Sequence, residues 1–152
     1  MASFRALVDA RIAHPYIQAQ MDAEFAVGDG LNHPTYVQRT LNRDKLRDLI
    51  AARMAELKLD AILYPQQRVL VAPTGQPDQP ERNGVLSHGT GFPAVTVPAA
   101  FSQATATAPL GVPIGAELLG LDYTEARLLS FAHAFERAAG VRRAPVGTPA
   151  LG

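Results

Sequence analysis

The 152-residue sequence contains no cysteine. This absence excludes disulfide bonds, a thiolate nucleophile and cysteine metal ligands. The four histidines show neither a His-x-x-x-His nor a His-Glu-x-x-His spacing, so no metal site is predicted. The formal net charge is zero, because the 14 basic residues are balanced by 14 acidic ones. Without a basic face, no nucleic acid or anionic lipid is predicted as a partner, and a small molecule or a protein is expected instead.

No secretory signal and no membrane-spanning helix is predicted from the sequence. Residues 1–11 are interrupted by charges and do not form a signal peptide. The stretch 84–116 has no Asp, Glu, Lys or Arg and is long enough to cross a bilayer, but it holds four prolines and five glycines. We therefore expect no contact with a membrane, a cytoplasmic protein, and a buried core built from this stretch.

Three short apolar segments predict strands, at about 60–64, 93–98 and 112–119. In the third segment Ile114, Ala116 and Leu118 would share one face, and their neighbours the other, because side chains alternate along a strand. Both faces are mostly apolar. A strand of this kind belongs in a sheet that is covered above and below, as in α/β proteins.

Apolar residues at helical spacing predict helices at about 2–12, 34–58 and 123–139, with a weaker pattern over 15–26. Asp122 is the predicted N-cap of the last helix, with Glu125 three residues later. The charged side of helix 34–58, which includes Arg47, is interpreted as exposed to solvent. The length suits one domain, with a helical part (1–58) and a strand and helix part (59–152).

The sequence offers little support for catalysis. No serine lies in a Gly-x-Ser-x-Gly or Ser-x-x-Lys motif, and no glycine-rich loop follows a strand to cradle a phosphate, so no cofactor is predicted. Ser87 and His88 adjoin each other in a segment, 83–92, that we predict to be a loop. Adjacent side chains on an extended chain point opposite ways, so His88 is poorly placed to deprotonate Ser87. Hydrogen bonding within the loop is the preferred interpretation.

Several short motifs resemble the C-terminal part of the amidase signature family, and they occur in the family's order. The strand at Asp60–Pro65 resembles the strand that follows the long helix of this family, and residues 1–35 share only its helical character. The motifs are Arg82-Asn83, Gly91–Ala99, Pro113–Gly120, Glu125–Leu129, Ala132–Glu136 and Thr148–Leu151. Ala100 departs from the family, which often has glycine there.

The resemblance implies a layered α/β hydrolase with a mixed sheet, which cleaves amide C–N bonds other than peptide bonds. In this family the nucleophile is a serine, assisted by a second serine on a cis peptide and by a lysine base. Those residues belong to a glycine- and serine-rich N-terminal portion that has no counterpart in this sequence. No catalytic residue can therefore be carried over to any position of the chain.

We predict that residues 1–152 form a single C-terminal segment of an amidase-like domain, a fragment or split subunit that is inactive alone. It would support the sheet and the substrate pocket of the complete enzyme, where a small-molecule amide binds. Its partner would be an N-terminal amidase half or a second copy of the chain. Asn83, Ser87, His88 and Phe92 are predicted to line the pocket. The alternative is an autonomous, non-catalytic binding or interaction module derived from an amidase.

Overall fold

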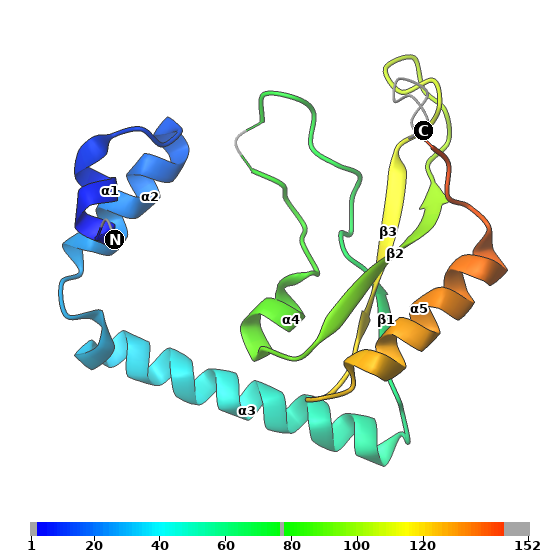
Figure 1. Ribbon diagram of the computed structural model, residues 1–152, viewed down its shortest axis with the longest axis horizontal. Coiled ribbons are helices and arrows are strands. Elements are labelled where there is room, and N and C mark those ends of the chain that lie inside the picture. Colours follow the sequence, from blue (N-terminus) through cyan, green and yellow to red (C-terminus); the bar gives the residue numbers. More distant parts are fainter. Residues whose placement is uncertain (1–2, 77, 145–152) are drawn as a thin grey trace. The chain divides into compact units, whose positions relative to one another are not determined.

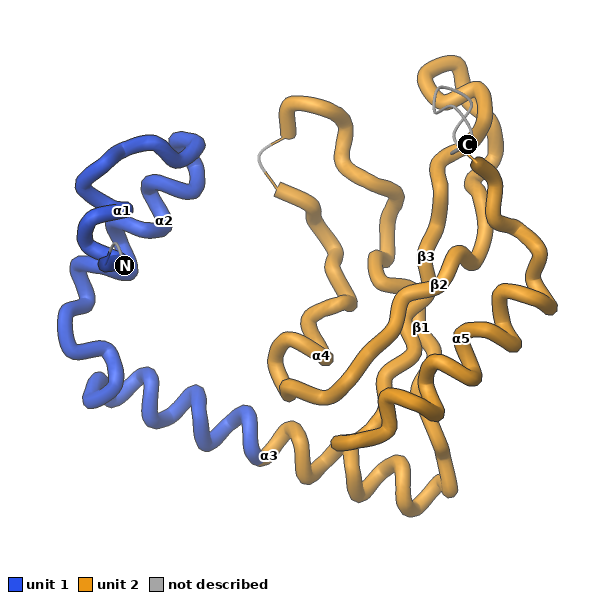
Figure 2. The backbone as a smooth tube through the Cα atoms, in the orientation of Figure 1, with its two compact units in different colours: residues 1–44 blue, residues 45–152 orange. Residues whose placement is uncertain are grey.

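The computed structural model describes residues 3–76 and 78–144 (Figure 1). The chain divides into two compact units, Met1–Asp44 and Lys45–Gly152 (Figure 2). Helix α3 (Pro34–Glu56) begins in the first unit and ends in the second. The family-like motif Thr148–Leu151 lies outside the described residues, as does most of the tail that contains it.

The first unit contains α1 (Phe4–Ala10), α2 (Pro15–Ala26) and the 3-10 turn η1 (Gly30–Asn32). Helix α1 begins at Ser3, whose Oγ accepts a hydrogen bond from an N–H of the first turn, and α2 begins with a proline, which suits the first helical position. The two helices contact each other, and the buried Gln18 of α2 donates to the Val8 carbonyl at 3.0 Å. Both helices predicted in this region are present.

The second unit is built on a three-stranded sheet of β1 (Ile62–Pro65), β2 (Ala94–Phe101) and β3 (Pro113–Leu119), in the order β1-β3-β2. Both pairings are antiparallel, so the sheet of the described residues is antiparallel throughout, and the mixed sheet that was expected is not seen among them. The sequence predicted that β2 would end at Pro98, but the strand continues to Phe101. It can continue because β2 is an edge strand of this sheet and a β-bulge follows the proline.

The core lies between one face of this sheet and helix α5 (Glu125–Ala139), as Figure 1 shows. Alternation in β3 brings Ala116 and Leu118 to this face, whereas Glu117 and Leu119 lie on the other face and are also buried. The prediction that β3 is covered on both sides is confirmed for these four residues. The core cluster comprises Val97, Ala116, Leu118, Leu128 and Ala132.

The segment predicted as a loop at 83–92 contains a short helix, α4 (Val85–Thr90), so that prediction is wrong. The helix ends at Gly91, which adopts a left-handed conformation with φ of 73° and donates its N–H to the Ser87 carbonyl at 2.7 Å. The Thr90 hydroxyl donates to the Leu86 carbonyl at 2.6 Å, within the same helix. The interior Gly89, together with the shortness of the helix, concealed it in the sequence.

Arg47 of α3 does not lie on a solvated face as predicted. Its guanidinium donates to the Thr90 carbonyl at 2.5 Å and to the Asp122 carboxylate at 2.5 Å, and its carbon centre lies 4.4 Å from the centre of the Phe92 ring. The arginine thus closes the end of α4 and stacks on the buried phenylalanine that leads into β2. We call this set of contacts the Arg47 clamp.

Asp122 serves this clamp and does not cap α5. The N-cap residue is Thr124, whose hydroxyl donates to the Leu121 carbonyl at 2.7 Å. Tyr123 intervenes with a positive φ of 61°, so the chain turns between Asp122 and the first helical N–H groups. The predicted capping role of Asp122 is wrong for this reason.

The Arg47→Ala variant should lower the free energy of unfolding by about 2 kcal/mol, because two charge-assisted hydrogen bonds and a cation–π contact are lost. Arg53→Ala on the same helix is the matched control. Arg53 is exposed and, among the described residues, pairs with Glu56 alone, so its loss should cost less than about 0.5 kcal/mol. Urea-induced unfolding of the two variants measures the difference, and equal losses would contradict the clamp.

Candidate functional site

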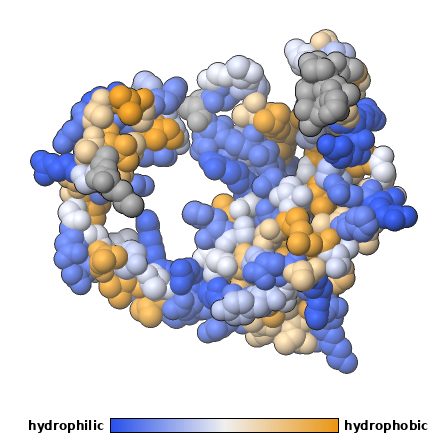
Figure 3. Space-filling model, in the orientation of Figure 1, coloured by the Kyte–Doolittle hydropathy of each residue, from blue (hydrophilic) through white to orange (hydrophobic). Residues whose placement is uncertain are grey.

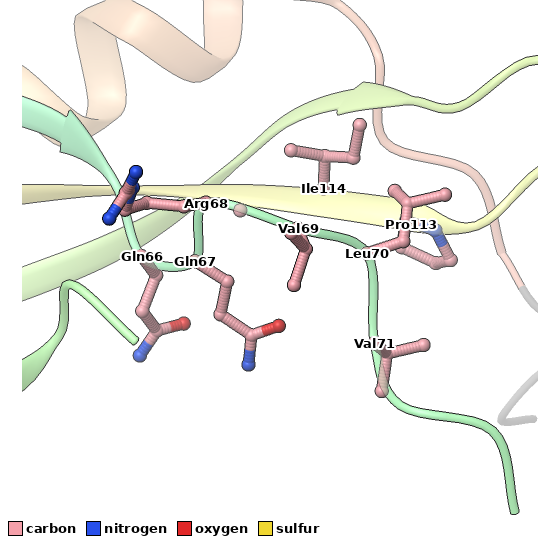
Figure 4. A pocket seen from close by; sticks show the side chains of 9 residues that line it. Gln66, Gln67, Arg68, Val69, Leu70, Val71, Pro113 and Ile114 are labelled. Carbon is pink, nitrogen blue, oxygen red and sulfur yellow. The ribbon is translucent and has the colours of Figure 1, made fainter. Parts of the chain in front are cut away.

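A groove opens in the second unit where β1 ends and β3 continues. One part, of about 410 Å³, is lined by residues 66–71 and by Pro113, Ile114 and Gly115 of β3 (Figure 4). An adjoining part, of about 370 Å³, is lined by Gln66, Gln67, Arg82, Gly84, Val85 and His88. Because the two parts share the glutamines, we treat them as one site and call it the glutamine groove.

The long loop 66–83, which forms a wall of this groove, is closed at its base by Asn83. The Asn83 side chain donates to the Pro65 carbonyl at 3.0 Å, and its backbone N–H donates to the Gln66 carbonyl at 2.9 Å. Gly84 donates to the same carbonyl at 3.0 Å. A side chain at Gly84 would meet the Gln66 Cγ at 2.9 Å, so glycine allows the close approach that fixes Gln66.

The two arms of this loop are held together farther out. Gln67 and Arg82 form an isolated antiparallel bridge, and the Arg68 N–H donates to the Glu81 carbonyl at 2.9 Å. The Gln79 side chain then accepts from the Ala72 N–H at 2.6 Å and donates to the Leu70 carbonyl at 3.2 Å. These bonds tie the two arms of the loop to each other and give the groove a firm wall.

The charges around the groove are paired within the loop itself. Arg68 contacts Glu81 at 2.8 Å, and Arg82 is bonded to Asp78. The side-chain amides of Gln66 and Gln67 make no hydrogen bond to another described residue, and Figure 4 shows both pointing to the same side as Val69. The groove therefore offers free amide donors and acceptors, and each of its two arginines is paired with an acid of the loop.

The four residues predicted to line a pocket have different surroundings. His88 is exposed and lines the groove, whereas Asn83 is half-buried and closes the loop base. Ser87 is half-buried on α4. Phe92 is only 5% exposed and lies against Arg47. Because Ser87 and His88 lie on a helix, their side chains diverge by about 100°, and no hydrogen bond joins them among the described residues.

A buried pair that sequence reasoning missed lies beside the groove. Glu117 is only 4% exposed, and its carboxylate accepts a hydrogen bond from the hydroxyl of Tyr64, its cross-strand partner. Burial of the phenol, together with the hydrogen bond and negative charge of Glu117, raises the pKa of Tyr64 above its ordinary value. The pair fixes the end of β1 before the chain enters the groove wall. Its only sequence signal was a single acid in an otherwise apolar strand.

The described lining of the groove consists of hydrogen-bonding and apolar groups. Among the described residues, no serine hydrogen bonds with a lysine or a histidine, and no three His, Cys, Asp or Glu side chains gather as metal ligands. No described helix combines the length and apolar character needed to span a membrane.

The Tyr64–Glu117 pair predicts that Tyr64 ionises at a higher pH than an ordinary tyrosine does, because its pKa is raised. Tyr64 holds its proton more tightly in the fold than in the unfolded chain. The stabilisation it contributes is therefore complete below about pH 10 and is lost as pH rises through the raised pKa. An absorbance titration should show a late step that Tyr64→Phe abolishes and that Glu117→Gln moves to lower pH.

The matched control is Tyr123→Phe, which removes a fully solvated tyrosine and should leave the late step in place. A late step that survives in the Tyr64→Phe variant would show that another tyrosine is the buried one.

Comparison with known proteins gives relatives of one kind. No family model matches the chain. A glutamyl-tRNA(Gln) amidotransferase subunit of Cupriavidus necator is 32% identical over 117 residues, which cover 71% of this chain and 22% of that protein. The corresponding protein of Neisseria meningitidis serogroup C is 32% identical over 111 residues, covering 68% and 22%. The chain thus spans about a fifth of the length of these curated relatives.

Solved structures resemble nearly the whole chain. The crystal structure of PAM12A has a TM-score of 0.69 and 26% identity, covering 93% of this chain and 29% of the other. Native peptide amidase from Stenotrophomonas maltophilia has a TM-score of 0.64 and 24% identity, covering 93% and 28%. The likeness therefore extends over both units of the chain, although each solved chain is more than three times as long.

Proposed function

Since the chain belongs to the amidase signature family, as a C-terminal portion of its fold, we propose that it supplies one wall of the substrate pocket in an amide-hydrolysing enzyme. In this proposal it contributes no nucleophile and no base. The complete enzyme would act in the cytoplasm on a small-molecule amide, and the glutamine groove would hold part of that substrate. The residues that cleave the amide would come from polypeptide other than these 152 residues.

The observation that carries the proposal is a formed binding groove without catalytic groups. Gln66, Gln67 and His88 present hydrogen-bonding atoms in it, and Asn83 holds the wall in place. We propose on these grounds that His88 contacts substrate directly and that Asn83 acts by positioning the wall. Ser87 and Phe92, which do not line the groove, would support it through α4 and the Arg47 clamp.

The surface of each unit supports a further polypeptide as partner. In the second unit Leu49 is 66% exposed and Leu129 is 61% exposed, and in the first unit Ile12 and Leu31 are also exposed. Figure 3 shows apolar side chains reaching the surface on the face in view. We propose that these exposed apolar side chains belong to the surface that such a partner would cover. The proposed partner is an N-terminal amidase portion, with a second copy of this chain as the other candidate.

A complementation assay tests the proposal. The purified chain is mixed with the N-terminal portion of the Stenotrophomonas peptide amidase, and ammonia release from a simple amide is followed. We expect no hydrolysis by the chain alone and hydrolysis by the mixture, because each part would lack what the other supplies. Heat-denatured chain serves as the control for the mixture.

Variants of the chain's own serines sharpen the assay. Ser87→Ala and Ser130→Ala should leave the restored hydrolysis within about twofold, since neither is proposed to be the nucleophile. Hydrolysis by the chain alone that is abolished by one of these substitutions would contradict the proposal. A monodisperse, protease-resistant monomer that never complements would favour the alternative, an autonomous binding module derived from an amidase.

A further inference from the structure

We propose that Tyr123 is a preformed anchor for the polypeptide that completes the amidase, and that its ring inserts into an apolar pocket of that partner. This role rests on the proposed function, because the partner is the N-terminal amidase portion proposed there, and it specifies where the second unit is held. Three features of the chain support it, namely the exposure of the ring, the backbone conformation that presents it, and the contacts that fix the turn around it.

The ring of Tyr123 is almost entirely exposed. Among the described residues no large apolar or aromatic side chain is more exposed than this one, at 95%. A tyrosine buries a large area when a partner covers it, and binding energy at protein interfaces is concentrated in residues of this kind. The ring is therefore free to be covered by another polypeptide.

The backbone of Tyr123 has a left-handed conformation, with φ of 61°. Glycine adopts this conformation readily, whereas a bulky side chain does so only with strain. Strain of this kind persists where the surrounding structure imposes it, and it is concentrated at functional positions. A ring that is almost fully exposed gains little from the chain itself, so the fold of the described residues does not account for a tyrosine at this position.

The other left-handed residues that are not glycine have explanations within the described chain. Lys58 ends α3, where its N–H donates to the Ala55 carbonyl at 3.1 Å in the usual left-handed helix end. Arg11 is the C-cap of α1, and Glu81 forms an ion pair within its own loop. Tyr123 follows no helix, and its exposed side chain forms no ion pair, so neither explanation applies to it.

The turn that carries Tyr123 is fixed on both sides. Before the tyrosine, the Asp122 carboxylate accepts from Arg47 of α3 at 2.5 Å. After it, Thr124, the N-cap of α5, donates its hydroxyl to the Leu121 carbonyl at 2.7 Å. Figure 1 shows the connection from β3 to α5 meeting α3 at this point. The ring thus projects from a fixed base, so a partner that covers it does not have to order the turn first.

The length of the related proteins supports the choice of occupant. The matched portion makes up 29% of one solved chain and 28% of the other. Most of the related fold is therefore polypeptide that these 152 residues do not contain, and the proposed function requires that polypeptide to bind here. A second copy of the chain is the other possible occupant, and the test separates the two.

Urea-induced unfolding of the full chain tests the strain at Tyr123. The Tyr123→Gly variant should raise the urea midpoint by about 0.3 M, because glycine relieves the left-handed conformation. The matched control is Lys58→Gly, which places glycine at the left-handed helix end with φ of 53° and should raise the midpoint in the same way. A midpoint of Tyr123→Gly at or below that of the unmodified chain would overturn the proposed role, because the tyrosine would then stabilise its own chain.

Competitive capture tests binding. The tagged N-terminal portion of the Stenotrophomonas peptide amidase is co-expressed with the unmodified chain and one variant, and mass spectrometry compares their captured ratio with their ratio in the lysate. Tyr123→Gly should be captured about tenfold less well, although it is the more stable chain. Tyr123→Phe, which keeps the ring, and Lys58→Gly should both be captured within about twofold of the unmodified chain. Stability and binding then change in opposite directions at Tyr123 alone.

A direct readout uses the unmodified chain labelled with fluorotyrosine. Its Tyr123 signal in fluorine nuclear magnetic resonance is the one that Tyr123→Phe removes. In the captured complex this signal should shift and should become protected from a dissolved paramagnetic probe, because the ring is buried by the partner. This measurement does not depend on the folding of either glycine variant.

Equal capture of Tyr123→Gly and the unmodified chain, or a Tyr123 signal that stays accessible in the complex, would overturn the proposed role. An equal loss of capture by Lys58→Gly would also overturn it, since the effect would then follow from any left-handed glycine. Self-association of the chain alone that Tyr123→Gly abolishes would identify a second copy as the occupant and overturn the choice of partner.

These outcomes are separate from those of the complementation assay. Capture that depends on Tyr123 without restored hydrolysis would leave the anchor standing while contradicting the proposed function. Restored hydrolysis with capture that does not depend on Tyr123 would do the opposite. Absence of any capture would contradict both, because the anchor is proposed for that partner.

Discussion

Burial of β3 on both faces is the constraint on which the second unit depends. Leu118 and Ala116 are covered by α5, while Leu119 and Glu117 are buried on the opposite face. A strand covered in this way must occupy the interior of a sheet, with a neighbour on each side. It has neighbours on both sides from Ala116 onward, but only β2 beside Gly115. The groove lies where β3 extends beyond the end of β1.

The spacing of apolar residues in the sequence was enough to predict the longer helices and two of the strands. Helices α3 and α5 and strands β1 and β3 lie within a few residues of their predicted bounds, because a long apolar stripe or a two-faced apolar run allows few other structures. Helix α4 was missed because its six residues include a glycine and no charge, so neither propensity nor periodicity marks it. Its ends are fixed by hydrogen bonds that depend on the rest of the fold.

The features that matter most for the site were beyond sequence reasoning for a different reason. The Arg47 clamp joins residues 43 and 75 positions apart, and the Tyr64–Glu117 bond joins residues 53 apart. Each residue has an ordinary explanation in its local context, as a helix-surface charge, a helix cap or a strand residue. Only the sheet register and the closing of α4 bring the partners together. The family-like motifs pointed to the correct fold because they record these long-range requirements indirectly.

The loop 66–83, which we propose as one wall of a substrate pocket, is held by hydrogen bonds at its base and between its arms. Ordering so many residues is costly in conformational entropy, and a loop left free would impose that cost on each ligand. Asn83 at the base and Gln79 within the loop supply hydrogen bonds that a second layer of structure would otherwise provide. The internal ion pairs neutralise the loop's own arginines. In the proposed pocket, a wall held in this way would not have to be ordered by the ligand, so binding would not include that entropic cost.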